Sequence, residues 1–369
     1  MNLFFLIVFG LYFLLMILLL VGWRMKPSAH RDGHGLAMMT VVVPFRNEEN
    51  SIDKLIDDLD KLSYAAGRFE VVLVNDHSTD LSAEIVTKHI ANRNNFRMLS
   101  LPVGTEGKKQ AITYAVLNSV GDIIVTTDAD CRVPVKWLDF INECFKDGHL
   151  KMVMGGVRIA EGDHLFSQFQ TLEFSSLIGV CGATSGLGFP AMCNGANLAF
   201  LKSAFLEVKG YEGNFAVASG DDEFLMRKIY HHFSGAIYFL AARESVVTTL
   251  AQKTMKDFMH QRLRWAGKWK YNSSWSSRWL AVFVLIFQIS FLLLLMTSLF
   301  KGADLQWILV LVGLKLVLEF FFLYRVCTFL GVKFRAFHFL VLQLAYPFYV
   351  IFIGVTSFFL AYKWKGRSF

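Results

Sequence analysis

The fold is decided by residues 39–49, which read MTVVVPFRNEE. The first part is an apolar, β-branched run typical of a strand buried on both faces, and the second part is a polar cluster. The same order recurs in residues 70–78, EVVLVNDHS, and in residues 123–130, IIVTTDAD. This recurrence predicts parallel strands that each end in polar side chains.

Amphipathic segments separate these apolar runs. We expect strands over residues 39–43, 70–74, 96–99 and 123–127, with helices over residues 50–62, 82–90 and 108–118. Such alternation predicts a doubly wound α/β sheet. Ligands of these sheets bind at the carboxyl ends of the strands, so the polar clusters mark the candidate site.

The composition excludes both a wholly water-soluble enzyme and a disordered chain. Of 369 residues, 54% are hydrophobic and 18% are charged, and 36 Phe, 8 Trp and 11 Tyr are present. Eight basic and two acidic residues lie from Trp279 onward, whereas residues 23–278 are close to neutral. We therefore expect positive charge that flanks membrane segments, and no nucleic-acid partner.

Residues 3–22 form an unbroken apolar run long enough to span a bilayer. We expect residues 1–23 to be a retained transmembrane helix. The alternative, a signal peptide, lacks a basic segment before the run and a small-x-small cleavage site after it. Arg24, Lys26 and Arg31 follow the run, so the positive-inside rule places residues 37–278 in the cytosol, on a multi-pass protein of the cytoplasmic (inner) membrane.

Residues 279–369 are predicted to be a C-terminal transmembrane region with three hydrophobic segments, 279–300, 306–324 and 337–362. Four spans in all place the C-terminus outside the cell, but the basic residues near the end favour the inside. The alternatives are that the last segment, broken at Pro347, is partly re-entrant or interfacial, or that another segment does not cross. Lys315 and Glu319 lie four apart in a membrane segment, where we expect a structural ion pair over a role in lipid entry.

Two features of the central region concern local structure. Residues 179–195 are rich in Gly, Ala and Ser, which predicts a mobile loop. The five cysteines are an odd number without metal-ligand spacing, so we expect reduced thiols rather than disulfides or a zinc site.

Asp128-Ala129-Asp130 follows an apolar run, where the chain leaves the predicted sheet. Both carboxylates can reach one divalent cation, and hard oxygen ligands suit Mg²⁺ or Mn²⁺ held together with a diphosphate. By itself the triplet is equally compatible with a solvated turn.

Six motifs occur in order: VVVPFRNEE (41–49), VNDHSTD (74–80), GK (107–108), DAD (128–130), GDD (220–222) and QRLRW (261–265). Together they resemble the family 2 glycosyltransferases over about residues 39–265. The resemblance implies a GT-A fold, which is a Rossmann-like doubly wound sheet, and a cytosolic glycosyltransferase domain over residues 37–278.

In that family the first two strand ends hold the nucleotide of a sugar donor, usually uridine diphosphate. The resemblance implies that Pro44 and Glu48 lie along the base and ribose, and that Asp76 accepts a hydrogen bond from the uracil or ribose. The alternative for residues 76–80 is an N-cap by Ser78 or Asp80, with Asp76 still free to act as a ligand.

The next two motifs concern the diphosphate. By resemblance Lys108 faces the nucleotide, with an ordinary solvated lysine as the alternative; Gly107-Lys108 is not a Walker A loop, since Lys109 rather than Ser or Thr follows. Asp130, supported by Asp128, would hold the Mg²⁺ or Mn²⁺ that stabilises the departing diphosphate.

Asp222 is the candidate catalytic base, because it occupies the second acid of the family's acid pair. A base on the face opposite the leaving group implies inversion at the anomeric carbon. An acid-rich helix N-terminus would equally account for Asp221 and Glu223.

The remaining residues concern the acceptor and the diphosphate. Gln261, Arg264 and Trp265 match the family's Gln-x-x-Arg-Trp motif, and Asn194 and Gly195 fall in its acceptor-side loop; Asp221 completes this set. An arginine fork suits a diphosphate, and an indole can stack on a sugar. A basic and aromatic helix on the membrane surface is a compatible alternative, because residues 262–275 precede a span.

We therefore predict a membrane-bound inverting glycosyltransferase. It would transfer a sugar from a nucleotide-sugar donor, expected to be a UDP-sugar, to a lipid or lipid-linked acceptor at the cytosolic face. The expected partners are therefore this donor, a lipid or saccharide acceptor, and membrane lipids. The alternatives are a processive polysaccharide synthase, which would share every motif, and a non-catalytic membrane scaffold that keeps the fold.

Overall fold

The structure is a computed structural model, and it describes residues 3–25, 35–146, 148–162, 164–215, 220–267, 275–301, 305–357, 359, 363–364 and 367–368. Two compact units make up the chain. The sheet unit comprises Lys26–Ala160 and Gly188–Leu250, and the helical unit comprises Met1–Met25, Glu161–Leu187 and Ala251–Phe369.

The sheet unit is built on a seven-stranded sheet with the order β3-β2-β1-β4-β7-β5-β8. The strands are β1 (Met39–Phe45), β2 (Phe69–Asn75), β3 (Phe96–Ser100), β4 (Ile123–Thr126), β5 (Met152–Gly155), β7 (Leu198–Leu201) and β8 (Ile237–Leu240). Strands β1 to β4 pair in parallel, whereas β7 is antiparallel to both β4 and β5. The predicted α/β sheet is thus confirmed, and its second half contains both parallel and antiparallel pairs of strands.

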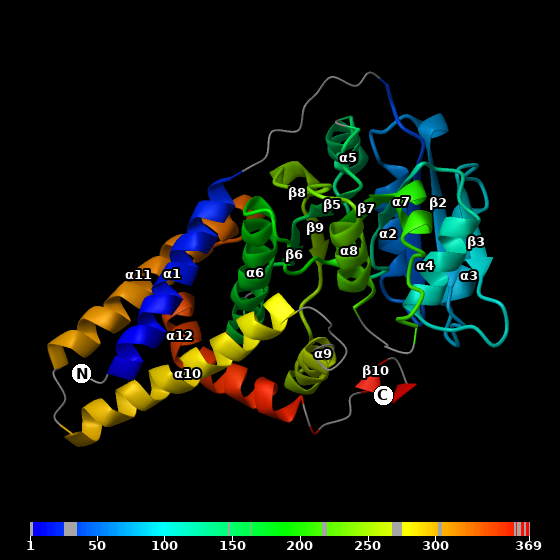
Figure 1. The fold of residues 1–369 in the computed structure, drawn as a ribbon. Helices are drawn as coiled ribbons and strands as arrows, with labels where there is room; N and C mark the ends of the chain where they lie inside the picture. The colour runs from blue at the N-terminus through cyan, green and yellow to red at the C-terminus, as the bar shows by residue number, and fades with distance from the viewer. Residues whose placement is uncertain are drawn as a thin grey trace. The chain divides into compact units, whose positions relative to one another are not determined.

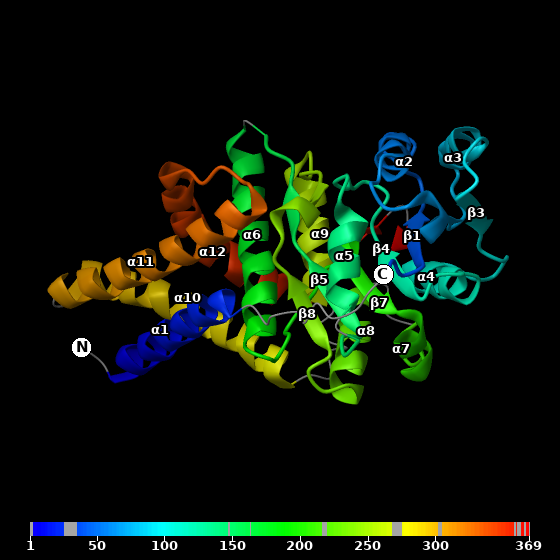
Figure 2. The ribbon, with the colours of Figure 1, turned by 90° about the horizontal axis from the view of Figure 1, so that it is seen from above.

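Helices flank this sheet, as a pattern of alternating buried strands and amphipathic segments requires. They are α2 (Ile52–Asp60), α3 (Ser82–Ile90), α4 (Lys108–Leu117), α5 (Trp137–Phe145), α7 (Lys202–Glu207) and α8 (Asp221–His232), with short 3-10 turns η1 (Ala66–Arg68), η2 (Gly195–Asn197) and η3 (Arg243–Ser245). Figure 2 shows α2 and α3 on one face of strands β1 to β3 and α4 on the other. A small parallel pair, β6 (Val157–Ile159) and β9 (Val247–Thr249), completes the unit.

A buried carboxylate ties the first strands to the segment before β4. Glu70, 8% exposed, accepts hydrogen bonds from Thr40 Oγ1 (2.7 Å), Val120 N (2.7 Å) and Arg97 Nε (2.9 Å). Burial would raise the pKa of the Glu70 carboxyl, but these hydrogen bonds outweigh it and lower the pKa. Ionised Glu70 therefore stabilises the fold.

We expect Glu70→Gln to destabilise the sheet unit by about 1–3 kcal/mol, because a buried amide cannot accept the same three bonds. A lowered native pKa stabilises at pH values above the ordinary value and loses that contribution as the pH falls through the native pKa. The difference in apparent Tm between wild type and Glu70→Gln should therefore shrink as the pH falls below about 4. Scanning fluorimetry in detergent measures it, with exposed Glu84→Gln as the control; an equal difference at all pH values would contradict the prediction.

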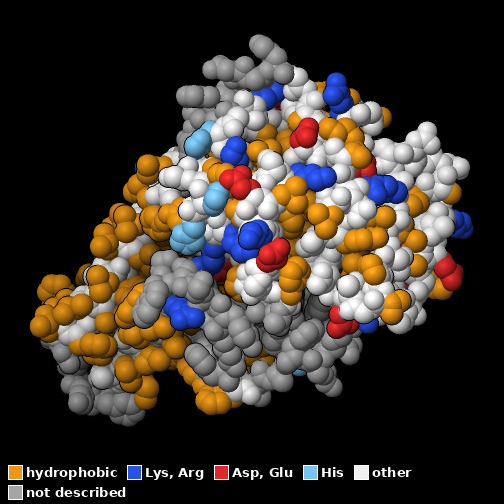
Figure 3. All heavy atoms as spheres, turned by 45° about the vertical axis from the view of Figure 1, so that its right-hand side comes forward, with side chains coloured by type: hydrophobic (Ala, Val, Ile, Leu, Met, Phe, Trp, Pro, Cys, Tyr) orange, Lys and Arg blue, Asp and Glu red, His pale blue; other side chains and the backbone are white. Residues whose placement is uncertain are grey.

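Among its described residues, the helical unit contains four helices that are long and apolar enough to cross a membrane. They are α1 (Leu3–Arg24), α10 (Trp275–Lys301), of which Arg278–Thr297 forms the span, α11 (Leu305–Leu330) and α12 (Ala336–Thr356). Hydrophobic side chains gather over these helices at the lower left of Figure 3. The unit also holds α6 (Leu165–Gly186), α9 (Met255–Gly267) and the short antiparallel pair β10 (Lys363–Trp364) and β11 (Arg367–Ser368).

The expected loop over residues 179–195 is wrong for its first half, because α6 continues to Gly186. Its glycines lie where helices approach closely. A Cβ on Gly186 would stand 2.1 Å from the carbonyl oxygen of Gly22 in α1, and a Cβ on Gly179 would stand 2.8 Å from Val326 Cγ2 in α11. Small residues here permit backbone contact between helices, as in membrane bundles.

Gly186→Leu should lower the apparent Tm of the purified protein, because any side chain at this crossing meets the α1 backbone. We expect a cost of about 1–3 kcal/mol. Gly10→Leu is the matched control, since no atom lies within 4 Å of a Cβ there. Equal melting temperatures for the two variants would contradict the close crossing.

A polar network lies among the apolar helices. Lys315 and Glu319 form the expected ion pair (Nζ to Oε1, 2.9 Å), and Gln343 Nε2 of α12 donates to Glu319 Oε2 (2.6 Å). Tyr12 of α1 also donates to Glu319. Three helices thus satisfy the charge, as burial in a membrane demands.

One prediction about the membrane segments differs from the structure, and several predicted residues lie outside the part that the structure describes. Within the last predicted membrane segment, 337–362, the helix α12 (Ala336–Thr356) runs without a break through Pro347. Lys26, Arg31, Lys365 and part of the basic stretch between residues 262 and 275 lie outside the described residues.

Candidate active site

The strand order reverses at β1, which has β2 on one side and β4 on the other. Figure 1 shows β2 next to β3, and Figure 2 shows β1 next to β4. Such a reversal opens a crevice beyond the carboxyl ends of the strands, where ligands of open α/β sheets bind. The polar residues after β1, β2 and β4 all lie at this edge. Pro44 lies on β1, opposite Val74 of β2 and beyond Val42, the last β1 residue that pairs with β4.

The loops after β1 and β2 hold each other through reciprocal hydrogen bonds. The amide of Glu48 donates to Ser82 Oγ (2.7 Å), and the amide of Thr79 donates to Asn47 Oδ1 (2.8 Å). Asp80 Oδ1 accepts from the amide of Ser82 (3.0 Å), the first residue of α3. Asn47 has a positive φ of 54°, a conformation that Asn tolerates better than most residues. The two loops therefore form one fixed rim around Glu48.

Asp76 connects this rim to α4. Its carboxylate is 3% exposed, and Oδ2 accepts from the amide of Gly107 (3.1 Å), which immediately precedes Lys108. Arg46 Nη1 donates to the backbone oxygen of Asp76 (2.9 Å). Gly107 has φ +95°, which favours glycine, so Asp76 fixes the turn that begins α4.

Lys108 lies between two acidic motifs that are far apart in sequence. Its Nζ donates to Asp128 Oδ1 (2.6 Å) and lies 3.4 Å from Asp221 Oδ2. Burial would lower the pKa of the Lys108 ammonium, but the carboxylates of Asp128 and Asp221 outweigh burial and raise the pKa. Lys108 therefore stays charged at physiological pH and reduces the repulsion between the acids.

The acid pair at the start of α8 faces the loop that holds Gly195. Asp222 Oδ2 accepts from the amide of Gly195 (3.0 Å), and Asp222 Oδ1 accepts from the amide of Glu223 (2.8 Å). A Cβ on Gly195 would lie 3.2 Å from Lys108 Nζ and 3.4 Å from Asp221 Oδ2, closer than most side chains allow. A glycine thus lets the backbone approach the acids.

The loop itself is held from the sheet side. Thr126 Oγ1 of β4 donates to the carbonyl of Gly195 (2.8 Å), and Asn194 Oδ1 accepts from the amide of Ala196 (2.9 Å). Buried Asn197 accepts from Trp137 Nε1 (2.9 Å) and donates to the carbonyl oxygen of Gly156 (2.8 Å). Asn194 and Gly195 are therefore fixed relative to β4 and its acids.

The carboxylates that follow β4 suit a metal ion that is also held by a bound substrate. Within the described ranges, no three His, Cys, Asp or Glu side chains group as a complete metal site. Mg²⁺ in phosphate chemistry commonly takes only one or two protein carboxylates, and phosphate oxygens and water fill its other positions. Asp128 and Asp130 are two carboxylates of this kind, and the Asp128 side chain is 40% exposed although it contacts Lys108.

The predicted site residues thus divide between the units. Asp128, Lys108, Asp221, Asp222 and Gly195 come together in the sheet unit, with the rim of Pro44, Glu48 and Asp76 linked to them through Gly107. Gln261, Arg264 and Trp265 lie on α9, in the helical unit.

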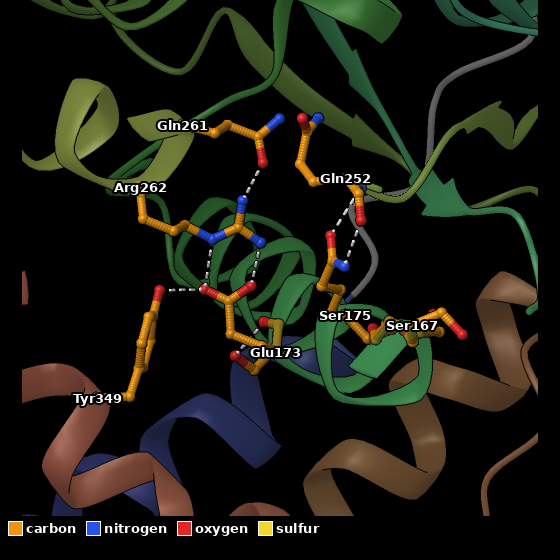
Figure 4. Close-up of polar contacts among 10 residues, drawn as sticks. Ser167, Glu173, Ser175, Gln252, Gln261, Arg262 and Tyr349 are labelled. Atoms are coloured by element: carbon orange, nitrogen blue, oxygen red, sulfur yellow. Dashed lines mark hydrogen bonds and ion pairs between the residues drawn. The ribbon is translucent and has the colours of Figure 1, made fainter. Parts of the chain in front are cut away.

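Two residues near that motif were not predicted from the sequence. Glu173 of α6 pairs with Arg262, the neighbour of Gln261, and Tyr349 of α12 donates a hydrogen bond to Glu173 (Figure 4). A single Glu among the apolar and small residues of 165–186 was the available signal, because an acid in such a segment needs a partner.

Comparison with known families places the chain. It belongs to glycosyl transferase family group 2, which matches residues 123–362, and glycosyl transferase family 2 matches residues 40–203. The family expected from the six motifs is confirmed. The chain therefore belongs to a family of glycosyltransferases.

Curated relatives match through part of their length. A poly-beta-1,6-N-acetyl-D-glucosamine synthase from Staphylococcus aureus (strain MSSA476) is 30% identical over 188 residues, 50% of this chain and 44% of the relative. An undecaprenyl-phosphate 4-deoxy-4-formamido-L-arabinose transferase from Pectobacterium carotovorum is 30% identical over 141 residues, 38% of this chain and 42% of the relative. The chain thus matches less than half the length of these relatives.

A solved structure shares the fold. A mannosyltransferase from Pyrobaculum calidifontis, in complex with GDP-Man and Mn²⁺, matches 96% of both chains with a TM-score of 0.59 and 18% identity. The predicted GT-A fold is therefore confirmed.

Proposed function

We propose that this protein transfers one sugar from a nucleotide-sugar donor, a UDP-sugar, to a lipid or lipid-linked acceptor, with inversion at the anomeric carbon. One observation carries the proposal: Lys108, Asp128, Asp221, Asp222 and Gly195 come together at the carboxyl edge where the strand order reverses. A positively charged lysine beside paired carboxylates suits a reaction that has an anionic leaving group and a hydroxyl nucleophile.

The rim after β1 and β2 would bind the nucleoside. Pro44 and Glu48 would lie along the base and ribose, and Asp76 would accept a hydrogen bond from them. Asp76 also accepts from Gly107, so nucleoside binding and the position of Lys108 are coupled through one turn. Lys108 would then face the diphosphate.

Asp130 and Asp128 would hold Mg²⁺ or Mn²⁺ together with the donor diphosphate. When bound, the cation supplies Lewis-acid stabilisation of the charge on the leaving diphosphate. The Asp128 carboxylate, shared between Lys108 and this position, would set the distance between the ammonium and the donor.

Asp222 would take the proton from the acceptor hydroxyl. Amides of Gly195 and Glu223 hold both its oxygens, which fixes the carboxylate and leaves lone pairs for the proton. Asn194 and Gly195 would line the acceptor, and Asp221, through its ion pair with Lys108, would separate the acceptor from the diphosphate.

The acceptor is proposed to come from the membrane. Four helices among the described residues that are long and apolar enough to cross a membrane support this, and the basic residues after α1 favour a cytosolic sheet unit in the cytoplasmic membrane. Gln261, Arg264 and Trp265 on α9 would bind the acceptor or its diphosphate. The similarity to an undecaprenyl-phosphate sugar transferase supports a lipid-linked acceptor.

A processive polysaccharide synthase is the second candidate, favoured by the similarity to a poly-beta-1,6-N-acetyl-D-glucosamine synthase. Product size separates the two. We would incubate the full chain in lipid nanodiscs with Mn²⁺, labelled UDP-sugars and membrane lipid, and size the product by chromatography. One labelled glycolipid supports single transfer, whereas a ladder or a high-mass polymer would make the protein a synthase.

A further inference from the structure

A buried ion pair joins three elements of the helical unit. Arg262 of α9 and Glu173 of α6 are each 3% exposed. Arg262 Nε donates to Glu173 Oε1 (3.1 Å) and Nη2 donates to Oε2, so the two groups form a fork. Tyr349 of α12 donates its hydroxyl to Glu173 Oε1 (2.9 Å), as Figure 4 shows.

The same guanidinium contacts two members of the proposed acceptor set. Arg262 Nη1 donates to Gln261 Oε1, and the guanidinium carbon lies 4.3 Å from the centroid of the Trp265 ring. The ring of Phe258 lies 4.5 Å from it as well. A single planar group therefore restrains an amide and an indole that flank it on α9.

A buried ion pair of this kind adds little net stability to a fold. Burying two charges costs several kcal/mol per ion before their attraction is counted, and apolar residues of similar volume often stabilise as well or better. The forked pair does fix the orientation of the Arg262 side chain, because a guanidinium held at two nitrogens has a fixed plane. That plane sets the direction of the Trp265 ring that stacks on it.

We propose that Arg262 is a positioning residue for the acceptor, held in place by Glu173 and Tyr349, and that it fixes the orientation of Gln261 and Trp265. The inference rests on the acceptor role proposed above for α9. It also assigns a task to Tyr349, because this hydroxyl makes the plane of Arg262 dependent on membrane helix α12.

The decisive experiment replaces the whole polar cluster with apolar side chains of similar size. The triple variant Glu173→Met/Arg262→Met/Tyr349→Phe leaves no buried charge unpaired, so we expect it to fold with an apparent Tm near that of wild type. We expect its acceptor KM to rise about tenfold or more, while the KM for the donor and the acceptor-independent hydrolysis of the donor stay unchanged. Tyr349→Phe alone should raise the acceptor KM by a smaller factor.

The controls separate positioning from packing. Glu161→Gln removes the partner of Lys333, an exposed pair of the same unit, and should change nothing. A triple variant that regains wild-type stability and wild-type acceptor KM would show that the cluster only supports packing, and would overturn the proposal. A triple variant that does not fold would make the pair essential to stability and would equally contradict it; Tyr349→Phe with an unchanged acceptor KM would do the same.

A further variant distinguishes this inference from the proposed function. Trp265→Ala should raise the acceptor KM at least as much as the triple variant does. An unchanged acceptor KM in Trp265→Ala would disprove the acceptor role of α9, and the positioning role with it. A raised value in Trp265→Ala beside an unchanged value in the triple variant would disprove positioning alone.

Discussion

Asp222→Asn is expected to lower the rate of sugar transfer by about 10²–10⁴-fold, the range that a positioned general base contributes. The amide is nearly isosteric, and its oxygen can keep the hydrogen bond from Gly195, whereas the bond from the amide of Glu223 is lost. It cannot take the acceptor proton at neutral pH. Donor binding, measured by calorimetry with the nucleotide-sugar and Mn²⁺, should remain within about twofold of wild type, because the lost group acts only in the chemical step.

Glu223→Gln is the matched control for this prediction. Glu223 is the next acid on α8, but it pairs with Arg227 one turn along the same helix. Its loss should change transfer by less than about fivefold, because its carboxylate is engaged by Arg227 within α8. Full activity in Asp222→Asn, or a loss in Glu223→Gln equal to the one in Asp222→Asn, would assign the base elsewhere.

Asp130→Ala is expected to abolish the effect of Mn²⁺ on donor binding and to lower transfer by about 10²-fold or more. A Lewis-acid cation supplies several kcal/mol of charge stabilisation, and each 1.36 kcal/mol corresponds to a tenfold change in rate. Binding of UDP should be measured with and without Mn²⁺. Wild type should bind more tightly with the cation, whereas the variant should bind equally in both conditions.

Asp122→Asn provides the control, because Asp122 is exposed and lies immediately before β4, whereas Asp130 follows the strand. The change in formal charge is the same, but the distance from the proposed cation is that of the whole strand. If Asp130→Ala keeps a Mn²⁺-dependent gain in UDP affinity, the assignment of the metal to residues 128–130 is wrong.

The first half of the sheet could be predicted closely, because its strands are continuous apolar runs and its helices are amphipathic. Helix α3 has the bounds expected from the pattern, Ser82–Ile90, and β1 extends the expected strand by two residues, to Phe45. The second half resisted prediction. Strands β5, β7 and β8 have four residues each, too few for a periodic signal, and β7 pairs antiparallel to its neighbours.

The C-terminal part of helix α6 was predicted to be a loop for a different reason. Gly and Ser in an isolated segment favour loops, because they cost helix stability. In a membrane-type bundle the same residues allow helices to touch, and the packing of Gly186 on the Gly22 backbone outweighs the intrinsic preference. Only the partner helix decides between these outcomes, and the partner is about 160 residues away in sequence.

The sequence predicted which residues belong to the candidate site, but not how these residues contact one another. Motif order identified Asp128, Lys108 and Asp222 one by one. That Lys108 would bridge Asp128 and Asp221 depends on how α4, β4 and α8 meet in three dimensions. The pairing of Arg262 with Glu173 likewise joins residues 89 positions apart, and no local pattern encodes it.

Stoichiometry tests the central claim most directly. Nanodisc-embedded protein should be supplied with Mn²⁺, a membrane lipid extract and a panel of labelled UDP-sugars, and both the UDP released and the label in the lipid fraction should be counted. For one donor we predict one labelled sugar in the lipid for each UDP released, with no transfer when the lipid or the cation is left out. Label that enters no lipid, or transfer that proceeds fully without a cation, would contradict the account.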